Sequence, residues 1–328
     1  MKFWIVTPSY NQPDWLKLCI ASVADQAGSL CEQRTEDRGQ RSDALTSDLR
    51  SLTSGSGSSI HVHHHVQDAC STDGTREYLA EHLANSQQLK ANGYTFSYES
   101  SPDEGMYDAI NKGWKLAPDD VDVIAHLNCD EQYLLGALKV VAEFFKAHQK
   151  ADVVLADMIV VDKGGEYICH RRSLKPYKFL SRFCCAGMTA TTFQRASVTK
   201  EKGVFFDTSW RNIGDKVWYN ELHKVGCRFA VCNQMVSIFT DTGENLNWTE
   251  EGRREKIRYE EEFLHGSPAM TRVVARLNGL RRMLKERSAP APSQFSLYKM
   301  RSKREIMQIS DPRWRWNKSW RANGQEAT

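Results

Sequence analysis

The sequence predicts an α/β fold with a mixed, mainly parallel sheet flanked by helices. Three apolar runs, at residues 2–7, 60–66 and 121–127, have the length of buried strands, and each ends in a small polar cluster. Stretches with helical spacing follow, and strands that alternate with helices are typical of parallel sheets. With 328 residues, of which 41% are hydrophobic and 26% charged, the chain can bury a full core.

The first strand is broken by Pro8 and continues into the polar segment Ser9-Tyr10-Asn11. An amphipathic helix is expected next, because apolar residues recur there on one side of a helix. Its apolar residues are Trp15, Leu16, Leu18, Cys19 and Val23.

Residues 28–59 separate this helix from the second strand and are rich in Ser, Arg, Asp and Gly. A connection between a helix and a strand normally takes only a handful of residues. The sequence therefore predicts a mobile polar insertion at 28–59.

The second strand, residues 60–66, contains four histidines and ends in a turn at 67–75 that opens a helix. In a strand, His61, His63 and His65 share one face. That face is either simply polar or part of a transition-metal site. We favour a polar face, because no Cys or carboxylate follows at a spacing typical of metal sites.

The third strand, residues 94–98, leads through a turn with Pro and Gly into another helix. On this helix Asp108, Asn111 and Lys112 lie within one turn and can face the same ligand. The alternative is a surface ion pair between Asp108 and Lys112, which would contribute only about 0.3–0.5 kcal/mol.

The fourth strand ends in Asn128-Cys129-Asp130-Glu131. Ligands of open α/β sheets bind at the carboxyl ends of the strands, and hard divalent cations prefer oxygen ligands. The segment therefore predicts a site for a metal ion and a diphosphate. The alternative is that Asp130 caps a helix that begins near Tyr133.

Four motifs in this order resemble the family 2 glycosyltransferases of the GT-A fold, including those of bacterial polysaccharide biosynthesis, over residues 2 to about 226. The resemblance implies a GT-A domain at 1–263, with a nucleotide-sugar half at about 1–131 and an acceptor half at about 132–263. The motifs are SYNQPDWLKLCIASVADQ, QDACSTDGT, SPDEGMYDAINKG and LNCDEQYL.

The resemblance also implies roles for individual residues. The Asp at the end of the second strand contacts the nucleobase in this family, and Asp68 is the match. The acidic pair binds the donor diphosphate through Mg or Mn, which places the metal on Asp130 with Glu131 in a secondary role. The other residues implied in nucleotide and donor binding are Thr7, Pro8, Tyr10, Asp108, Lys112 and Asn128.

The chain departs from the family pattern at two places. It has Asp130-Glu131 where the family usually has two aspartates, and Ala69-Cys70 where the family often has a glycine. A Glu keeps the charge and offers a ligand oxygen, so we expect the chemistry to survive.

In the acceptor half, strands at 151–161 and 166–171 flank Gly164-Gly165 and predict a hairpin. Asp215 opens a predicted helix, and the resemblance implies that it is the catalytic base. An inverting transfer needs such a base, because the acceptor hydroxyl loses a proton as it attacks. Asp215 is alternatively a helix N-cap, and Asp157 and Asp207 are reserve candidates for the base.

The tail, 264–328, has fourteen Lys and Arg residues against four Asp and Glu residues. Residues 272–285 follow a helical period with apolar and basic faces, and three tryptophans lie among basic residues after 313. This pattern predicts a basic amphipathic helical tail that contacts an anionic membrane surface or packs on the body with a solvated face. Nucleic acid is not expected, because no known binding module accompanies the charge.

The nine cysteines show no CxxC spacing, so neither a disulfide framework nor a zinc ribbon is expected. No run approaches the roughly 20 apolar residues of a membrane span, and the start of the chain does not resemble a signal peptide. We therefore expect a cytoplasmic protein, with a peripheral position on the inner face of the membrane as the option that the tail offers.

Together these features predict an inverting, metal-assisted transfer of a sugar from a nucleotide-diphosphate donor to a glycan or a lipid-linked glycan. A nucleotidyltransferase is an alternative, but residues 7–11 lack the Gly-rich basic loop typical of that class. A second alternative, prompted by Cys70 and Glu131, is a degenerate homologue that binds nucleotide or scaffolds a membrane assembly.

Overall fold

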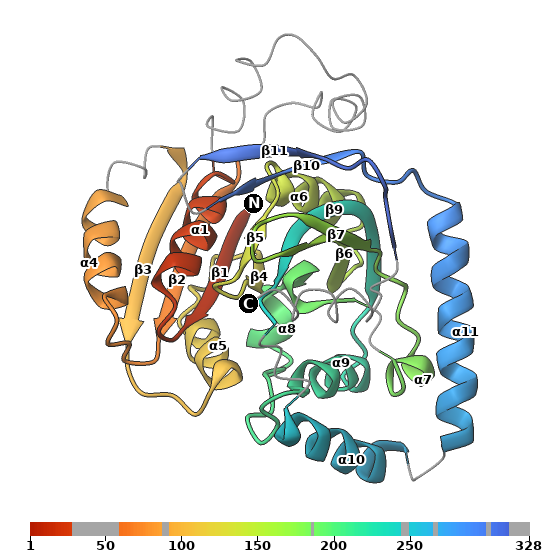
Figure 1. The fold of residues 1–328 in the computed structure, drawn as a ribbon. Coiled ribbons are helices and arrows are strands. Elements are labelled where there is room, and N and C mark those ends of the chain that lie inside the picture. The colour runs from red at the N-terminus through yellow and green to blue at the C-terminus, as the bar shows by residue number, and fades with distance from the viewer. Residues whose placement is uncertain are drawn as a thin grey trace.

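The computed structural model describes residues 1–27, 59–86, 92–184, 187–243, 249–264, 268–299 and 303–314. In this part of the chain, nine strands form one sheet in the order β3-β2-β1-β4-β8-β6-β9-β5, with β7 beside β6 (Figure 1). The strands are β1 (Lys2–Ser9), β2 (His61–Asp68), β3 (Tyr94–Ser100), β4 (Val123–His126), β5 (Glu131–Tyr133), β6 (Val153–Asp162), β7 (Tyr167–Arg171), β8 (Thr192–Arg195) and β9 (Phe229–Asp241). The helices are α1 (Pro13–Ala24), α4 (Thr75–Ser86), α5 (Met106–Lys115), α6 (Ala137–Ala147), α7 (Lys178–Ser181), α8 (Ala196–Lys200), α9 (Gly214–Lys224), α10 (Glu250–Leu264) and α11 (Pro268–Arg287).

The predicted α/β fold is confirmed, and its parallel part is the half of the sheet nearest the amino terminus. Strands β3, β2, β1 and β4 run parallel to one another. Their carboxyl ends therefore lie at one edge, toward which the arrows of β2 and β3 point in Figure 1. In the other half, β8 runs antiparallel to β4 and β6, while β6 and β9 are parallel.

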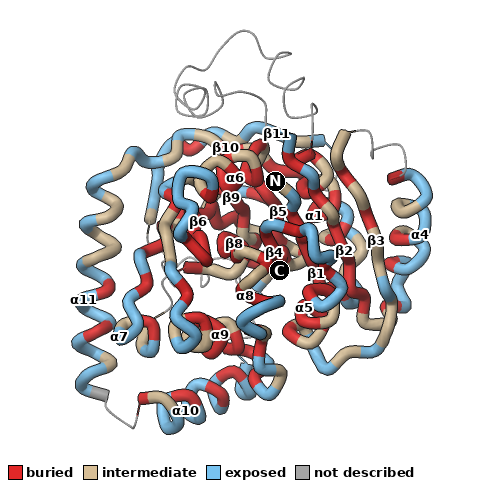
Figure 2. Tube along the Cα trace, turned by 180° about the vertical axis from the view of Figure 1, so that it is seen from behind, coloured by how far each residue is buried: buried red, intermediate tan, exposed pale blue. Residues whose placement is uncertain are grey.

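Side chains of β1 alternate between two hydrophobic cores, one on each face of the sheet. Phe3 and Ile5 belong to the core that α1 and α6 cover. Trp4 and Val6 belong to the core that contains Trp114 of α5 and the residues of α9. Residues 3–9 of β1 are buried (Figure 2), and the bulky apolar residues at 3–6 are typical of a central parallel strand.

The predicted hairpin in the acceptor half is confirmed, since β6 and β7 pair antiparallel. Gly165 turns the chain there with a φ of +82°, a left-handed conformation that glycine adopts without strain. By contrast, the predicted helix after Glu131 begins later than expected, because residues 131–133 first form β5 and pair with β9.

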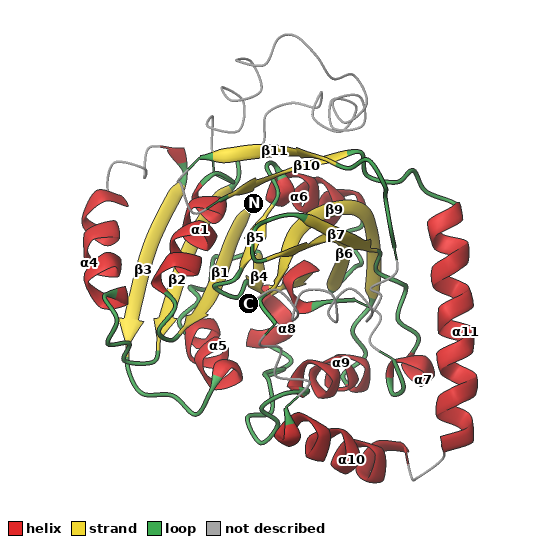
Figure 3. Ribbon diagram, viewed as in Figure 1, coloured by secondary structure: helices red, strands yellow, loops and turns green. Residues whose placement is uncertain are grey.

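The tail contributes both a helix and a second, two-stranded sheet (Figure 3). The predicted amphipathic helix is α11. The hairpin of β10 (Gln294–Tyr298) and β11 (Arg304–Gln308) is a feature that the sequence analysis did not predict. It lies across the end of the molecule opposite the carboxyl ends of β2 and β3 (Figure 1).

The tail hairpin is fastened to the body by buried polar contacts. The Gln132 side chain bonds the backbone N–H and C=O of Tyr298 at 2.8 and 3.0 Å. Arg304 forms an ion pair with Asp25 at 2.9 Å and donates to the carbonyl of Tyr133. These contacts are long-range, which explains why local sequence patterns did not reveal the hairpin.

The mobile polar insertion was predicted at 28–59, and its residues 28–58 lie outside the described part of the chain. The tryptophans at 316 and 320, which belong to the predicted basic tail, lie outside it as well. Among the described helices, none has both the length and the apolar character needed to cross a membrane.

Candidate functional site

The ends of three neighbouring parallel strands bring polar residues together in register. Ser9 of β1 lies opposite Asp68 of β2, and Asp68 lies opposite Ser100 of β3. Strand β4 ends beside them and leads into Asn128. The predicted donor-binding residues of the second and fourth motifs therefore lie at one edge of the sheet.

Asp68 is buried and holds the turn that follows β2. Its carboxylate accepts hydrogen bonds from the Ser100 hydroxyl at 2.6 Å and from the Ser71 backbone N–H at 3.0 Å. The Ser71 hydroxyl also donates to Asp68 and accepts from the Asn11 backbone N–H at 2.9 Å. Asp68 thus connects the first and second motifs.

Cys70 explains how the chain tolerates one departure from the family pattern. Its φ of +60° lies in the left-handed region, where a glycine fits without strain. The turn thus keeps the backbone that a glycine permits, although a residue with a side chain occupies it.

The predicted donor-binding residues near the end of β1 take different positions. Thr7 lies in the core, where its hydroxyl is 2.9 Å from His64 Nε2. Pro8 is buried, whereas Tyr10 is 61% exposed. The Asn11 side chain accepts from the Thr72 backbone N–H at 2.9 Å. Tyr10 therefore lies at the site edge, but the structure does not bring the Thr7 side chain to it.

Asp130 and Glu131 follow each other in the chain, with Asp130 half-buried and Glu131 buried. Glu131 is 2% exposed and accepts a hydrogen bond from the Asn128 backbone N–H at 2.8 Å. Burial raises the pKa of both carboxyls, and the charge of Asp130 raises the pKa of Glu131 further. Because Glu131 enters β5, Asp130 does not cap a helix at this point.

Two buried oxygen atoms at this edge have no hydrogen-bond partner among the described residues. They are the Ser9 hydroxyl and the Asn128 side-chain carbonyl. Buried polar groups are nearly always satisfied, so an unpartnered pair at the ends of adjacent strands indicates a place for a ligand.

The residues present fit a divalent cation that shares its ligands with a phosphate group. Asp130, Glu131 and Asn128 offer oxygen atoms, which such cations prefer. No cluster of three His, Cys, Asp or Glu residues suited to a metal occurs in the described ranges.

Helix α5 carries the predicted pair from the third motif. Lys112 Nζ lies 2.9 Å from an Asp108 carboxylate oxygen and also donates to the Pro102 carbonyl at 2.7 Å. The Glu104 backbone N–H donates to Asp108 at 3.1 Å. The two side chains are 35% and 20% exposed, so the ion pair of the alternative interpretation forms at a surface that a ligand can reach.

Asp215 lies in the first turn of α9, directly against α5. Its backbone N–H donates to the Tyr107 hydroxyl at 3.1 Å, and its carboxylate accepts from the Lys216 N–H at 2.8 Å. Gly214 is required here, because a Cβ at this position would lie 2.6 Å from the Tyr107 ring. Burial raises the pKa of the Asp215 carboxyl. The structure thus joins the helix of Asp108 to the helix of the predicted base.

Glu255 of α10 is a residue that the sequence analysis missed. It is buried, and its carboxylate accepts the backbone N–H groups of Arg211, Asn212 and Ile213 at 2.6, 2.8 and 3.0 Å. This carboxylate fixes the segment that leads into α9. No local pattern indicates the role, because the partners are more than forty residues away.

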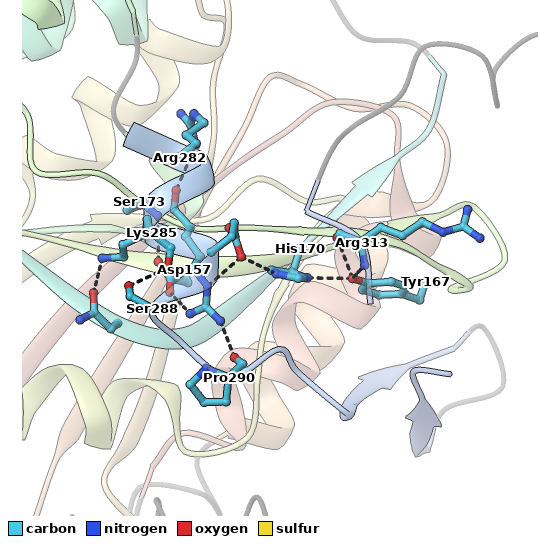
Figure 4. A network of polar contacts seen from close by, with 12 residues as sticks. Asp157, Tyr167, His170, Ser173, Arg282, Lys285, Ser288, Pro290 and Arg313 are labelled. Atoms are coloured by element: carbon cyan, nitrogen blue, oxygen red, sulfur yellow. Dashed lines mark hydrogen bonds and ion pairs between the residues drawn. The ribbon is translucent and has the colours of Figure 1, made fainter. Parts of the chain in front are cut away.

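The two reserve candidates for the base have structural partners. Asp157 is fully buried and bonds Arg172 at 3.1 Å and the Ser173 N–H at 2.8 Å (Figure 4). Asp207 accepts from the Ser209 N–H at 2.9 Å in a local turn. Asp215 is therefore the better candidate.

His63 and His65 of β2 share a polar strand face, as favoured from the sequence, and both contact the Ser97 hydroxyl. His63 contacts the Thr95 and Ser97 hydroxyls at 2.8 and 2.7 Å and stacks on Trp4 with ring centroids 4.1 Å apart. Burial lowers the pKa of His63 to about 4, which keeps the imidazole neutral near pH 7.

The family model described as Glycosyl transferase family 2 matches residues 4–205. No curated protein sequence matches the chain.

Solved structures of glycosyltransferases resemble the chain at low sequence identity. S. aureus TarS 1-349 in complex with UDP-GlcNAc is 18% identical, with a TM-score of 0.52 over 76% of this chain and 61% of that one. Mannosyltransferase PcManGT from Pyrobaculum calidifontis, in complex with GDP-Man and Mn2+, is 12% identical, with a TM-score of 0.50 over 83% and 68%. The chain thus spans less than two thirds of the TarS structure, and the likeness concerns the fold.

Proposed function

The chain belongs to Glycosyl transferase family 2, and from this premise we propose that it transfers a sugar from a nucleotide-diphosphate donor to an acceptor hydroxyl with inversion. The acceptor would be a glycan or a lipid-linked glycan. The observation that supports this best is the convergence at one edge of the sheet. Asp68 and the unpartnered oxygens of Ser9 and Asn128 lie at or just beyond the carboxyl ends of β2, β1 and β4, and Asp130 and Glu131 follow Asn128 in the chain.

The donor would lie along this edge. Asp68 is rigidly held by Ser71 and Ser100, which suits a residue that orients a nucleobase. Ser9 and Asn128 offer the polar atoms that still need partners. When bound, a Mg or Mn ion on Asp130 and Glu131 would compensate the charge of the leaving diphosphate.

Asp215 would act as the general base. As the acceptor oxygen attacks the anomeric carbon, its proton passes to the Asp215 carboxylate, and the bond from that carbon to the diphosphate oxygen breaks on the opposite face. The nucleoside diphosphate then leaves. The raised pKa of Asp215 makes this carboxylate a better proton acceptor than an exposed one. Tyr107 and Glu255 hold the start of α9 and thereby set the position of the base.

The two departures from the family pattern give no support to a degenerate homologue. Cys70 keeps a left-handed backbone in the turn after Asp68. Glu131 keeps a second carboxyl beside Asp130. We therefore propose a single function.

The proposal is tested by calorimetric titration with UDP, GDP and dTDP, each with and without Mn2+. We expect one nucleotide to bind tightly only with Mn2+, and binding to be lost in Asp130→Ala. Asp119→Ala is the matched control, because Asp119 is fully exposed and pairs with Lys200. Failure of all three nucleotides to bind with metal, or equal binding by both variants, would contradict the assignment of the donor site.

A further inference from the structure

One face of α11 presents an apolar stripe to solvent. Its residues follow a spacing of three and four, so they fall within roughly 80° of the helix circumference. Each is between 42% and 55% exposed. They are Met270, Val273, Leu277, Leu280 and Leu284.

The opposite face of α11 is fastened to the body, so the stripe cannot turn inward. Val274 is 1% exposed. Arg282 donates to the Arg172 carbonyl at 3.0 Å, and Glu286 bonds both His170 and Arg172 (Figure 4). The helix stands at one edge of the molecule in both Figures 1 and 2. The outward direction of the stripe is therefore part of the fold.

Two exposed aromatic side chains extend this apolar surface. Arg281 donates to the Lys175 carbonyl at 2.7 Å and lies over the Tyr177 ring, 5.0 Å from its centroid. Tyr177 and the nearby Phe179 of α7 are 52% and 55% exposed. Aromatic rings of this kind are favoured where an apolar phase meets water.

The charge around the stripe is positive. Arg272, Arg276 and Arg287 of α11 are exposed, as are Lys175 and Lys178 beside the aromatic rings. The one acidic residue within α11 is Glu286, which His170 and Arg172 engage. The carboxylates of α10 belong to a separate helix, which runs across the molecule below α11 (Figure 1).

This charge distinguishes between a second copy of the chain and a lipid surface as the occupant. Two α11 stripes packed together would bring arginines of both helices near each other without exposed acidic partners on α11. Paired helices normally place opposite charges at such flanks. An anionic bilayer instead supplies both an apolar layer and negative head groups.

We propose that the α7–α11 surface, made of the stripe with Tyr177 and Phe179, docks on an anionic membrane, with α11 lying in the plane of the interface. The helix would not span the bilayer. Ser181 of α7 contacts His223 of α9 at 2.9 Å, so docking would hold the helix of Asp215 near the lipid surface. The docking itself is independent of the proposed transferase activity.

The test is co-sedimentation of the full chain with vesicles of phosphatidylcholine, alone or mixed with phosphatidylglycerol. We expect binding to the mixed vesicles, weaker at high salt because head-group attraction is screened. The double variant Leu277→Glu with Leu280→Glu should bind at least tenfold more weakly. Ile257→Glu is the control, since Ile257 is 59% exposed on α10, outside the stripe. All three substituted positions are exposed, so we expect both variants to fold, and melting curves check this.

Three outcomes would overturn the proposal. The first is no binding of the wild type to mixed vesicles. The second is equal binding by the double variant and the control, which would place any lipid contact elsewhere in the chain. The third is a wild-type dimer in solution that the double variant abolishes, which would make the stripe a self-association interface.

Discussion

Removing the charge of Glu255 should destabilise the protein far more than removing a charge elsewhere on the same helix. In Glu255→Gln an amide group replaces one carboxylate oxygen, so at least one of the three backbone N–H groups loses its acceptor. An unsatisfied buried donor costs about 1–3 kcal/mol, and the weakening of the other two bonds adds about 1 kcal/mol. We therefore expect the free energy of unfolding to fall by about 2–4 kcal/mol.

The assay is urea unfolding followed by tryptophan fluorescence, with Glu262→Gln as the matched control. Glu262 also lies on α10, but it forms an exposed pair with Arg258 at 2.7 Å that contributes at most about 0.5 kcal/mol. Where Glu255→Gln remains folded, we expect a lower kcat with unchanged nucleotide affinity, because Ile213 leads directly into the turn that carries Asp215. Equal stability of the two variants would refute the reasoning.

Three further predictions concern the base, the donor site and the tail. Asp215→Asn should lower kcat by about 10²–10⁴-fold, while nucleotide affinity, measured by calorimetry, stays unchanged. Burial raises the pKa of Asp215, and the carboxylate is the active form. The kcat of the wild type should therefore fall on acidification at a pH above the usual carboxyl range. Asn128→Ala should weaken nucleotide binding with little change in the free energy of unfolding, because its side-chain carbonyl has no partner to lose among the described residues. By contrast, Asn111→Ala should lower the free energy of unfolding by about 2–4 kcal/mol, because the Asn111 side chain bonds both the backbone N–H and the C=O of Phe206. Arg304→Ala should lower the unfolding free energy by about 3–5 kcal/mol, because it removes the cation of a buried ion pair with Asp25, and an unchanged denaturation midpoint would contradict this.

Much of the sheet could be predicted from the sequence because its signals are local. Strands β1 and β4 contain runs of apolar residues, β2 contains valines among histidines, and polar clusters follow all three, so that each segment predicts a strand by itself. The turn at Gly165 likewise predicts a hairpin from two adjacent residues. These features need no knowledge of distant parts of the chain.

The parts that escaped prediction depend on long-range contacts. Strand β5 forms because Glu131 to Tyr133 pair with β9, more than a hundred residues away. The hairpin of the tail depends on Gln132 and Arg304, whose partners are equally distant. The sequence alone cannot show which of several polar residues finds such a partner.

The candidate site was predictable in its residue types but only partly in its geometry. Asp68 is the last residue of β2, and Asp130 lies in the turn between β4 and β5. Thr7, by contrast, lies in the core and not at the site, because its hydroxyl forms a hydrogen bond with the His64 imidazole. Glu255 could not be predicted, since an isolated Glu in a charged helix resembles any solvated residue.

The most direct test of the proposed function is proton NMR of the donor during turnover. The nucleotide sugar whose nucleotide binds with Mn2+ would be incubated with the protein, with water or an added glycan as the acceptor. We expect the first product signal to come from the anomer opposite to the donor, and Asp215→Asn to suppress it. A product that keeps the donor configuration, or a signal undiminished in Asp215→Asn, would contradict an inverting transfer with Asp215 as base.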